Sequence, residues 1–184
     1  MMNGTFNVTG SGLMDDDDTL RRLIGMLRSA YSGELAAALA YRAHWKALSN
    51  AAERAAIMRI EREEWTHRKE VGVLLARLNA KPQRLREILM TMVGCGAGAA
   101  CHVGSWILPM YFAGRLEHAN IQEYVDGAEY AHALGLADFE RALLAMAAVE
   151  REHEEFFLST VAAHPWLPAL KRVFSWGKPM RALP

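Results

Sequence analysis

The chain has 184 residues, 52% of them hydrophobic and 23% charged, which is typical of one globular domain and not of a disordered segment. Its 21 basic and 21 acidic residues cancel, so no net field favours nucleic acid or another polyanion as a partner. The two cysteines, Cys95 and Cys101, form neither a CxxC pair nor a disulfide scaffold, which indicates a reduced, cytoplasmic location.

The first half of the chain predicts a short arm and two helices. Residues 1–14 are rich in Gly, Asn, Ser and Thr without the pattern of a signal peptide, and we expect them to form a mobile arm. Apolar residues recur every three or four positions over about 16–48 and again up to about residue 79. The break at 49–52 is short, so the two helices should be antiparallel. Pro82 ends the second helix.

The second half predicts two more helices and a tail. Residues 84–132 are helical in composition but are interrupted by glycines and by Pro109, and a fourth helix covers about 136–163. No alternating strand pattern is present in the sequence. We therefore predict an all-α, ferritin-like four-helix bundle over residues 15–163, with a long crossover between the second and third helices. Residues 164–184 form a short C-terminal extension.

One acidic residue on each predicted helix stands out as a metal ligand. Glu34 is isolated among alanines and leucines, where a carboxylate needs a partner. Two further glutamates are followed by a histidine three residues later, which places an oxygen and a nitrogen ligand on one helix face. The complete set is Glu34, Glu64, His67, Glu117, Glu150 and His153.

This set predicts a site for two metal ions. In carboxylate bundles, two Glu-x-x-His helices and a glutamate from each of the other two helices surround the pair, and we expect these last two glutamates to bridge. Glu34 and Glu64 are 30 residues apart and Glu117 and Glu150 are 33 apart, so the same helix-pair geometry is repeated. Carboxylates and imidazoles suit two Fe ions, with Mn as the alternative.

Other charged residues have simpler interpretations. A third Glu-x-x-His pair, Glu129–His132, lies too far along its helix from Glu117 to share a site and is interpreted as solvated. Tyr41 is either a hydrogen-bond partner of a ligand or a core residue. Solvated positions are expected at Glu61, Glu63, Glu70, Glu152, Glu154 and Glu155, and histidines that are packed or exposed, not ligands, at His44, His102, His118 and His164.

These motifs resemble the demethoxyubiquinone hydroxylase family of ferritin-like di-iron proteins over roughly residues 20–160. The resemblance depends on GELAAALAYR in the first helix, EEWTH and RLNAKP in the second, the Gly-rich segment, LEHANIQEY in the third and EREH in the fourth. It implies that the six residues bind iron, with Tyr41 and Tyr124 beside them, and that O₂ hydroxylates a quinone ring. The family usually has a His-Tyr pair where this chain has Glu123–Tyr124.

Residues 88–114 contain no Asp, Glu, Lys or Arg. A helix spanning a membrane here would pull Glu117 away from the bundle. Two interpretations remain: close packing against a helix or a second subunit through Gly94 and Gly98, or an apolar surface that takes an isoprenoid substrate from a membrane. The residues assigned to the second are Trp106, Ile107, Leu108, Phe112 and Trp176.

Three functions are compatible with these features. The first is a di-iron oxidoreductase that hydroxylates an apolar, quinone-like molecule with O₂ and an external electron donor, as a homodimer or larger assembly, in the cytoplasm or peripherally on the inner membrane face. The second is iron oxidation and storage, or peroxide scavenging as in rubrerythrins. The third is a metal-free helical interaction domain.

Overall fold

The computed structural model describes the backbone of residues 11–176 and the side chains of residues 16–176. In this range the chain forms helices and no strand, which confirms the all-α prediction. Residues 1–10 of the expected N-terminal arm and residues 177–184 of the expected tail lie outside the described part. The helices are α1 (Ser11–Ala47), α2 (Ala51–Arg77), α3 (Arg84–Ala100), α4 (Ile107–Ala133), α5 (Ala137–Val161) and α6 (Leu167–Phe174).

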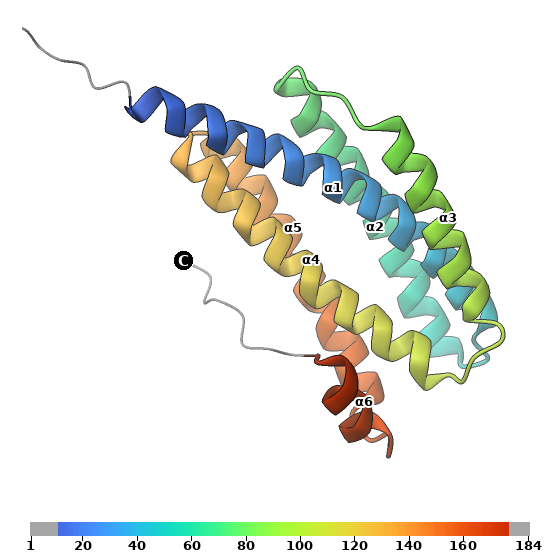
Figure 1. Ribbon diagram of the computed structural model, residues 1–184. Coiled ribbons are helices and arrows are strands. Elements are labelled where there is room, and N and C mark those ends of the chain that lie inside the picture. The colour runs from blue at the N-terminus through green and yellow to red at the C-terminus, as the bar shows by residue number, and fades with distance from the viewer. Residues whose placement is uncertain (1–10, 177–184) are drawn as a thin grey trace, which may run out of the picture.

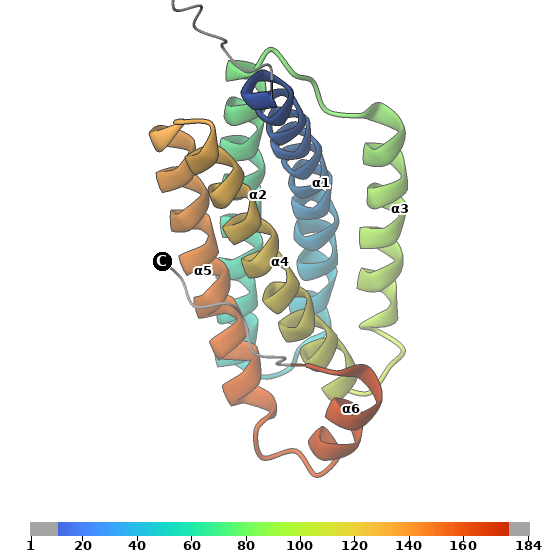
Figure 2. The same cartoon turned by 60° about the vertical axis from the view of Figure 1, so that its left-hand side comes forward.

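Four of these helices form the ferritin-like bundle. α1 packs against α2 and α4 packs against α5, in each case antiparallel, and the two pairs face each other (Figure 1). The connection from α2 to α4 runs the length of the molecule through α3, which lies outside the bundle against α1 (Figure 2). The long crossover is therefore present, and it is itself a helix.

Local signals explain the ends of α2 and the turn between α4 and α5. Asn50 caps α2, because its side-chain oxygen accepts hydrogen bonds from the amides of Ala52 and Glu53 at 2.9 and 3.2 Å. Asn79 (φ 53°) and Gly135 (φ 67°) adopt left-handed conformations just after α2 and α4. The expected helix start near residue 16 is too late, because α1 begins at Ser11.

The hydrophobic core has two parts, one on each side of the predicted metal ligands. One cluster includes Leu27 and Val71, and the other includes Tyr41, Ile60 and Phe157. On α1 and α2 the ligand positions fall between residues of the two clusters. The apolar clusters thus hold the four helices together above and below a polar layer.

α3 packs on α1 through small residues. A Cβ atom on Gly94 would lie 2.5 Å from the backbone oxygen of Ala36, and one on Gly98 would lie 2.6 Å from the Cβ of Ala43. The close packing expected of these glycines is therefore made with a helix of the same chain. The interrupted helix expected over 84–132 is in fact two helices, since residues 101–106 form a turn.

Gly94→Ala is expected to lower the free energy of unfolding by about 1–3 kcal/mol, because backbone atoms that cannot rotate away would have to shift. Gly96→Ala is the matched control: its Cβ meets nothing within 4 Å, so it should stabilise α3 by about 0.5–1 kcal/mol. Urea unfolding of the two variants measures both effects. Equal stabilities would show that α3 does not pack tightly on α1.

The expected apolar surface needs two corrections. Ile107 is 2% exposed and Trp176 is 6% exposed, and both belong to the core cluster that contains Tyr111. The indole ring of Trp176 packs against Tyr111 at a centroid distance of 5.1 Å and occupies the space that a side chain at Gly114 would fill. Trp176 therefore anchors the end of the described chain and does not lie on an outer surface.

A search for membrane-spanning segments finds none in the described residues: every helix falls short of the required length or apolarity.

Candidate metal centre

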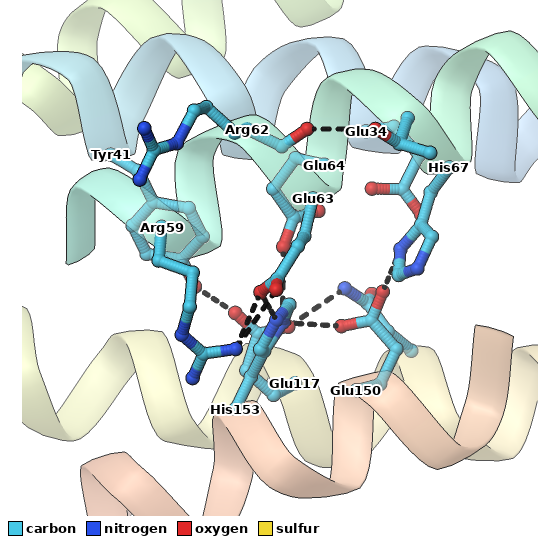
Figure 3. A network of polar contacts seen from close by, with 12 residues as sticks. Glu34, Tyr41, Arg59, Arg62, Glu63, Glu64, His67, Glu117, Glu150 and His153 are labelled. Carbon is cyan, nitrogen blue, oxygen red and sulfur yellow. Dashed lines mark hydrogen bonds and ion pairs between the residues drawn. The ribbon is translucent and has the colours of Figure 1, made fainter. Parts of the chain in front are cut away.

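The six predicted ligands meet in the middle of the bundle. Figure 3 shows the side chains of Glu64, Glu117 and Glu150 and the rings of the two histidines turned toward one another between the helices. Two groups of four have ligand atoms within 4.8 Å of one another: Glu34, Glu64, His67 and Glu150, and Glu64, Glu117, Glu150 and His153. α1, α2, α4 and α5 each contribute to the site, as the sequence predicts.

Two glutamates belong to both groups, and this differs from the sequence-based expectation. Glu34 and Glu117 were expected to bridge the two metals, but each lies in only one group. Glu64 and Glu150 are common to both. Glu34 lies in the group that contains His67, and Glu117 lies in the group that contains His153. Glu64 and Glu150 are therefore the residues that two metal ions at this site could share.

The burial and missing hydrogen bonds of these side chains fit a bound metal. All six are at most 4% exposed. Neither oxygen of Glu64 accepts a hydrogen bond, and one oxygen each of Glu34 and Glu150 and the Nδ1 atom of His153 are also unpartnered. Buried charged groups in proteins are normally paired or bound to metal, because their desolvation is costly. Two cations would satisfy these atoms together, and the oxygen and imidazole ligands suit iron or manganese.

Without a metal, three of the four carboxyl groups in the cluster have raised pKa values. Burial raises the pKa of Glu34 to about 6. Burial, followed by the negative charge of Glu150, raises the pKa values of Glu64 and Glu117 well above 4.5. Crowded carboxylates shift in this direction because each ionised group disfavours ionisation of the next.

Glu150 behaves in the opposite way. Burial raises its pKa, but the neighbouring imidazoles of His153 and His67 outweigh this and lower it below the usual range. The Nδ1 atom of His67 lies 2.8 Å from Glu150, and this contact raises the pKa of His67 despite the opposing effect of burial. Glu150 is therefore the carboxylate that stays ionised, in direct contact with His67.

Two tyrosines hold the outer glutamates. The hydroxyl of Tyr41 donates a hydrogen bond to Glu117, and that of Tyr124 donates one to Glu34. Both tyrosines are at most 2% exposed, so they are also core residues. Asn120 donates a further hydrogen bond to the second oxygen of Glu117, at 3.2 Å. The outer carboxylates are thereby oriented before any metal binds.

Glu63 is a functional candidate that the sequence did not reveal. Its carboxylate lies 2.8 Å from the Nε2 atom of His153, and Arg59 holds the same carboxylate at 2.9 and 3.0 Å. With the proton on Nε2 donated to Glu63, the Nδ1 atom of His153, which lies 3.3 and 3.4 Å from Glu64 and Glu150, would be free to bind a metal beside them. Arg59, four residues before Glu63, was the available signal, but it equally fits a surface ion pair.

Glu63→Ala is expected to weaken metal binding about 10- to 100-fold, because His153 loses the acceptor that sets its tautomer and ring orientation. Titration of the metal-free protein with Fe²⁺ or Co²⁺ under anaerobic conditions measures the effect. Glu70→Ala, an exposed position on the same helix, is the matched control and should bind as the wild type does. Equal affinities for both variants would remove Glu63 from this role.

Two more glutamates expected to be solvated are structural. Glu61 is 8% exposed and accepts hydrogen bonds from Arg42 and Trp45 of α1, so it joins α1 to α2. Glu154 contacts His118 at 2.9 Å and accepts a hydrogen bond from the Trp176 indole. The pair Glu129–His132 is exposed and lies outside both ligand groups, as expected.

An apolar groove lies beside α3 and is lined by Tyr41, the hydrogen-bond partner of Glu117. Its volume is about 750 Å³, and it runs between α1, the end of α3 and α4. Leu108 and Phe112, two residues of the expected apolar surface, also line it. Trp106 lies beside the groove, in a smaller neighbouring cavity, and its indole donates to Glu53. Tyr41 is therefore the residue that separates the groove from the polar centre of the bundle.

A four-helix bundle with buried Glu and Glu-x-x-His ligands on its inner faces defines the class of ferritin-like di-metal carboxylate proteins. Within this class, the model of the family described as ubiquinone biosynthesis protein COQ7 matches residues 21–124. The chain belongs to this family, whose members are di-iron proteins.

The family match and the structure support the site over different ranges. The matched residues include Glu34, Glu64, His67 and Glu117 but end before Glu150 and His153. The fold of α5 is what brings this last pair to the other four. No curated protein and no solved structure shows significant similarity to the chain.

Proposed function

We propose that this chain is a di-iron monooxygenase that hydroxylates the ring of an apolar, quinone-like molecule with O₂. The observation that carries this proposal is the position of Tyr41, which lines the apolar groove and donates a hydrogen bond to Glu117. A ring bound at this end of the groove would lie beside the metal cluster. Membership of a ubiquinone biosynthesis family supports both the di-iron centre and the quinone class of substrate.

When bound, the two metal ions supply the redox chemistry that activates O₂. One oxygen atom replaces a ring hydrogen as a hydroxyl group and the other leaves as water, which requires two electrons and two protons. These come from an external reductant, because the sequence contains no flavin or nicotinamide motif. The chain itself positions the ligands through Tyr41, Tyr124 and Glu63, and its apolar groove keeps water from the reacting ring.

We further propose that the substrate enters from a lipid surface. The outer face of α3 exposes Leu85, Ile88, Leu89 and Met92, by 55–81% of their surface, and the groove opens beside the end of this helix. Arg84 and Arg115, both exposed, flank the apolar region and suit anionic headgroups. Sedimentation with anionic vesicles tests this, with Leu89→Glu expected to reduce binding. A dimer that hides the same residues in solution is the competing outcome.

The activity is tested with protein loaded anaerobically with two equivalents of ferrous iron. O₂ and a chemical reductant are then added with a short-chain 2-alkyl-1,4-benzoquinone that has free ring positions. The expected result is a product heavier by one oxygen atom, with label from ¹⁸O₂ and not from water. The variant Glu64→Leu should give none, since both ligand groups lose a member.

Other outcomes would favour the alternatives. Growth of an iron mineral, or peroxide turnover without organic product, would support iron storage or peroxide scavenging. Less than one iron or manganese per chain after anaerobic loading would support a metal-free interaction domain. Glu34→Ala should weaken loading strongly, and unchanged loading would contradict the ligand assignment.

A further inference from the structure

His44 is a buried histidine that the fold leaves without a partner. Its side chain is 3% exposed, yet no hydrogen bond or ion pair to its ring is found among the described residues. Burial lowers the pKa of His44 to about 4, so at neutral pH the ring carries one N–H donor and one acceptor nitrogen. No group of the described chain bonds to either nitrogen, so both are left to water or to a ligand in the two cavities that the side chain lines.

The position of His44 gives this ring a place in the substrate site. It follows Tyr41 by three residues on α1, which is about 4.5 Å along the helix axis and on the same face. His44 lines the apolar groove together with Tyr41 and Phe112. From the cluster outward, the order along α1 is Glu34, Tyr41 and then His44.

His44 also lines a second cavity, of about 370 Å³, which contains Ser49, Asn50 and Glu53. The imidazole of His44 therefore lies at the boundary between the apolar groove and the polar cavity. Much of the groove is lined by apolar side chains, among them alanine and leucine. Of its polar residues, Tyr41 donates to Glu117, Arg115 donates to the backbone of Ser175, and His118 contacts Glu154. Within the groove, His44 is the buried polar side chain that no protein group satisfies.

We propose that His44 is a substrate-binding residue whose neutral imidazole forms a hydrogen bond with a ring oxygen of the molecule in the groove. This inference rests on the proposed function for the class of ligand, an apolar molecule with a carbonyl or hydroxyl oxygen on its ring. It adds a specificity element: the groove would select an oxygenated ring over a hydrocarbon of the same size. The hydrogen bond would also hold the ring of the ligand between His44 and the side of the cluster that contains Glu117.

The test compares two probes on the full chain loaded with ferrous iron in the absence of O₂. The first probe is 2-decyl-1,4-benzoquinone and the second is decylbenzene, which has the same tail and ring size without ring oxygens. Isothermal titration gives the affinity of each. Wild type should prefer the quinone, and His44→Phe should weaken quinone binding about tenfold while leaving decylbenzene unchanged.

Two further variants sharpen the result. His44→Gln keeps a donor and an acceptor and should restore part of the preference, and it remains informative if His44→Phe fails to fold. His102→Phe is the control, because His102 is exposed and lines only the polar cavity; it should leave both affinities unchanged. The inference is overturned if His44→Phe weakens the binding of both probes equally or changes neither affinity.

The same measurements separate this inference from the proposed function. Quinone binding that depends on His44, without any hydroxylated product, would contradict the monooxygenase and leave the binding role intact. Hydroxylation with unchanged KM in His44→Phe would contradict the binding role and leave the monooxygenase intact.

Discussion

Glu64→Leu is expected to abolish metal binding and, at the same time, to stabilise the metal-free protein. Glu64 belongs to both ligand groups, so its loss should reduce the metal content below one ion per chain. In the metal-free state both of its oxygens are buried without a hydrogen bond, and neighbouring carboxylates disfavour its charge. In other proteins, replacing buried ionic groups by apolar residues of similar volume often raises the free energy of unfolding by about 1–4 kcal/mol.

Thermal unfolding and metal analysis of the same samples measure both effects. A stabilisation of this size should raise the melting temperature of the metal-free protein by roughly 2–4 °C per kcal/mol. Ferrous iron should raise the melting temperature of wild type and not that of the variant. Glu70→Leu, an exposed position on α2, controls for the loss of charge and should still bind metal. A less stable metal-free variant, or one that retains two ions, would contradict the assignment.

This pairing of effects has a structural explanation. The metal site lies between the two hydrophobic clusters, and the residues that it needs are among the least favourable to bury. The clusters around Leu27 and Phe157, and hydrogen bonds such as that from Tyr124 to Glu34, hold the bundle together around this polar layer. The metal-free protein is therefore less stable than a bundle with an apolar residue at the position of Glu64 would be. In return, the ligands are already in place when the metal binds.

The six metal-ligand candidates were accessible from the sequence because they follow helix geometry. Residues three apart share a helix face, and two helix pairs with almost equal spacing return their glutamates to the same height. Residue spacing does not determine the rotation of one helix relative to the next. The sequence therefore predicted Glu34 and Glu117 as the bridging pair. In the structure, Glu64 and Glu150 are the residues that belong to both ligand groups.

The misassigned residues share a different cause. Three residues were misassigned because their partners lie on other helices. Glu61 contacts Arg42 of α1, and Glu63 contacts His153 of α5. Trp176 packs against Gly114 of α4. Nothing in the local pattern of charge or hydrophobicity encodes such partners. His44 likewise looks like an ordinary isolated histidine until the groove beside it is known.

The metal-free protein is expected to lose stability as the pH rises above 6.5, the ordinary pKa of histidine. The folded pKa values of Glu64 and Glu117 lie well above 4.5, and that of His67 is also raised. Each of these groups holds its proton to a higher pH in the folded state than in the unfolded state. The unfolded chain therefore binds fewer protons in this range, and the free energy of unfolding falls by about 1.4 kcal/mol per pH unit for each proton retained.

The measurement starts at pH 6.5 because, below this pH, His44 changes the free energy of unfolding in the opposite direction. Its folded pKa of about 4 is lower than the usual 6.5, so it favours folding as the pH rises between these values and is neutral in both states above them. Urea unfolding of chelator-treated protein at several pH values from 6.5 to 8.5 gives the slope, which Glu64→Leu should reduce. Metal loading should flatten or reverse the slope, because metal binds the deprotonated ligands. A metal-free protein whose stability is constant or increases across this range would show that its buried carboxyl groups are already ionised, and that the histidines and tyrosines around them suffice to hold those charges without a metal.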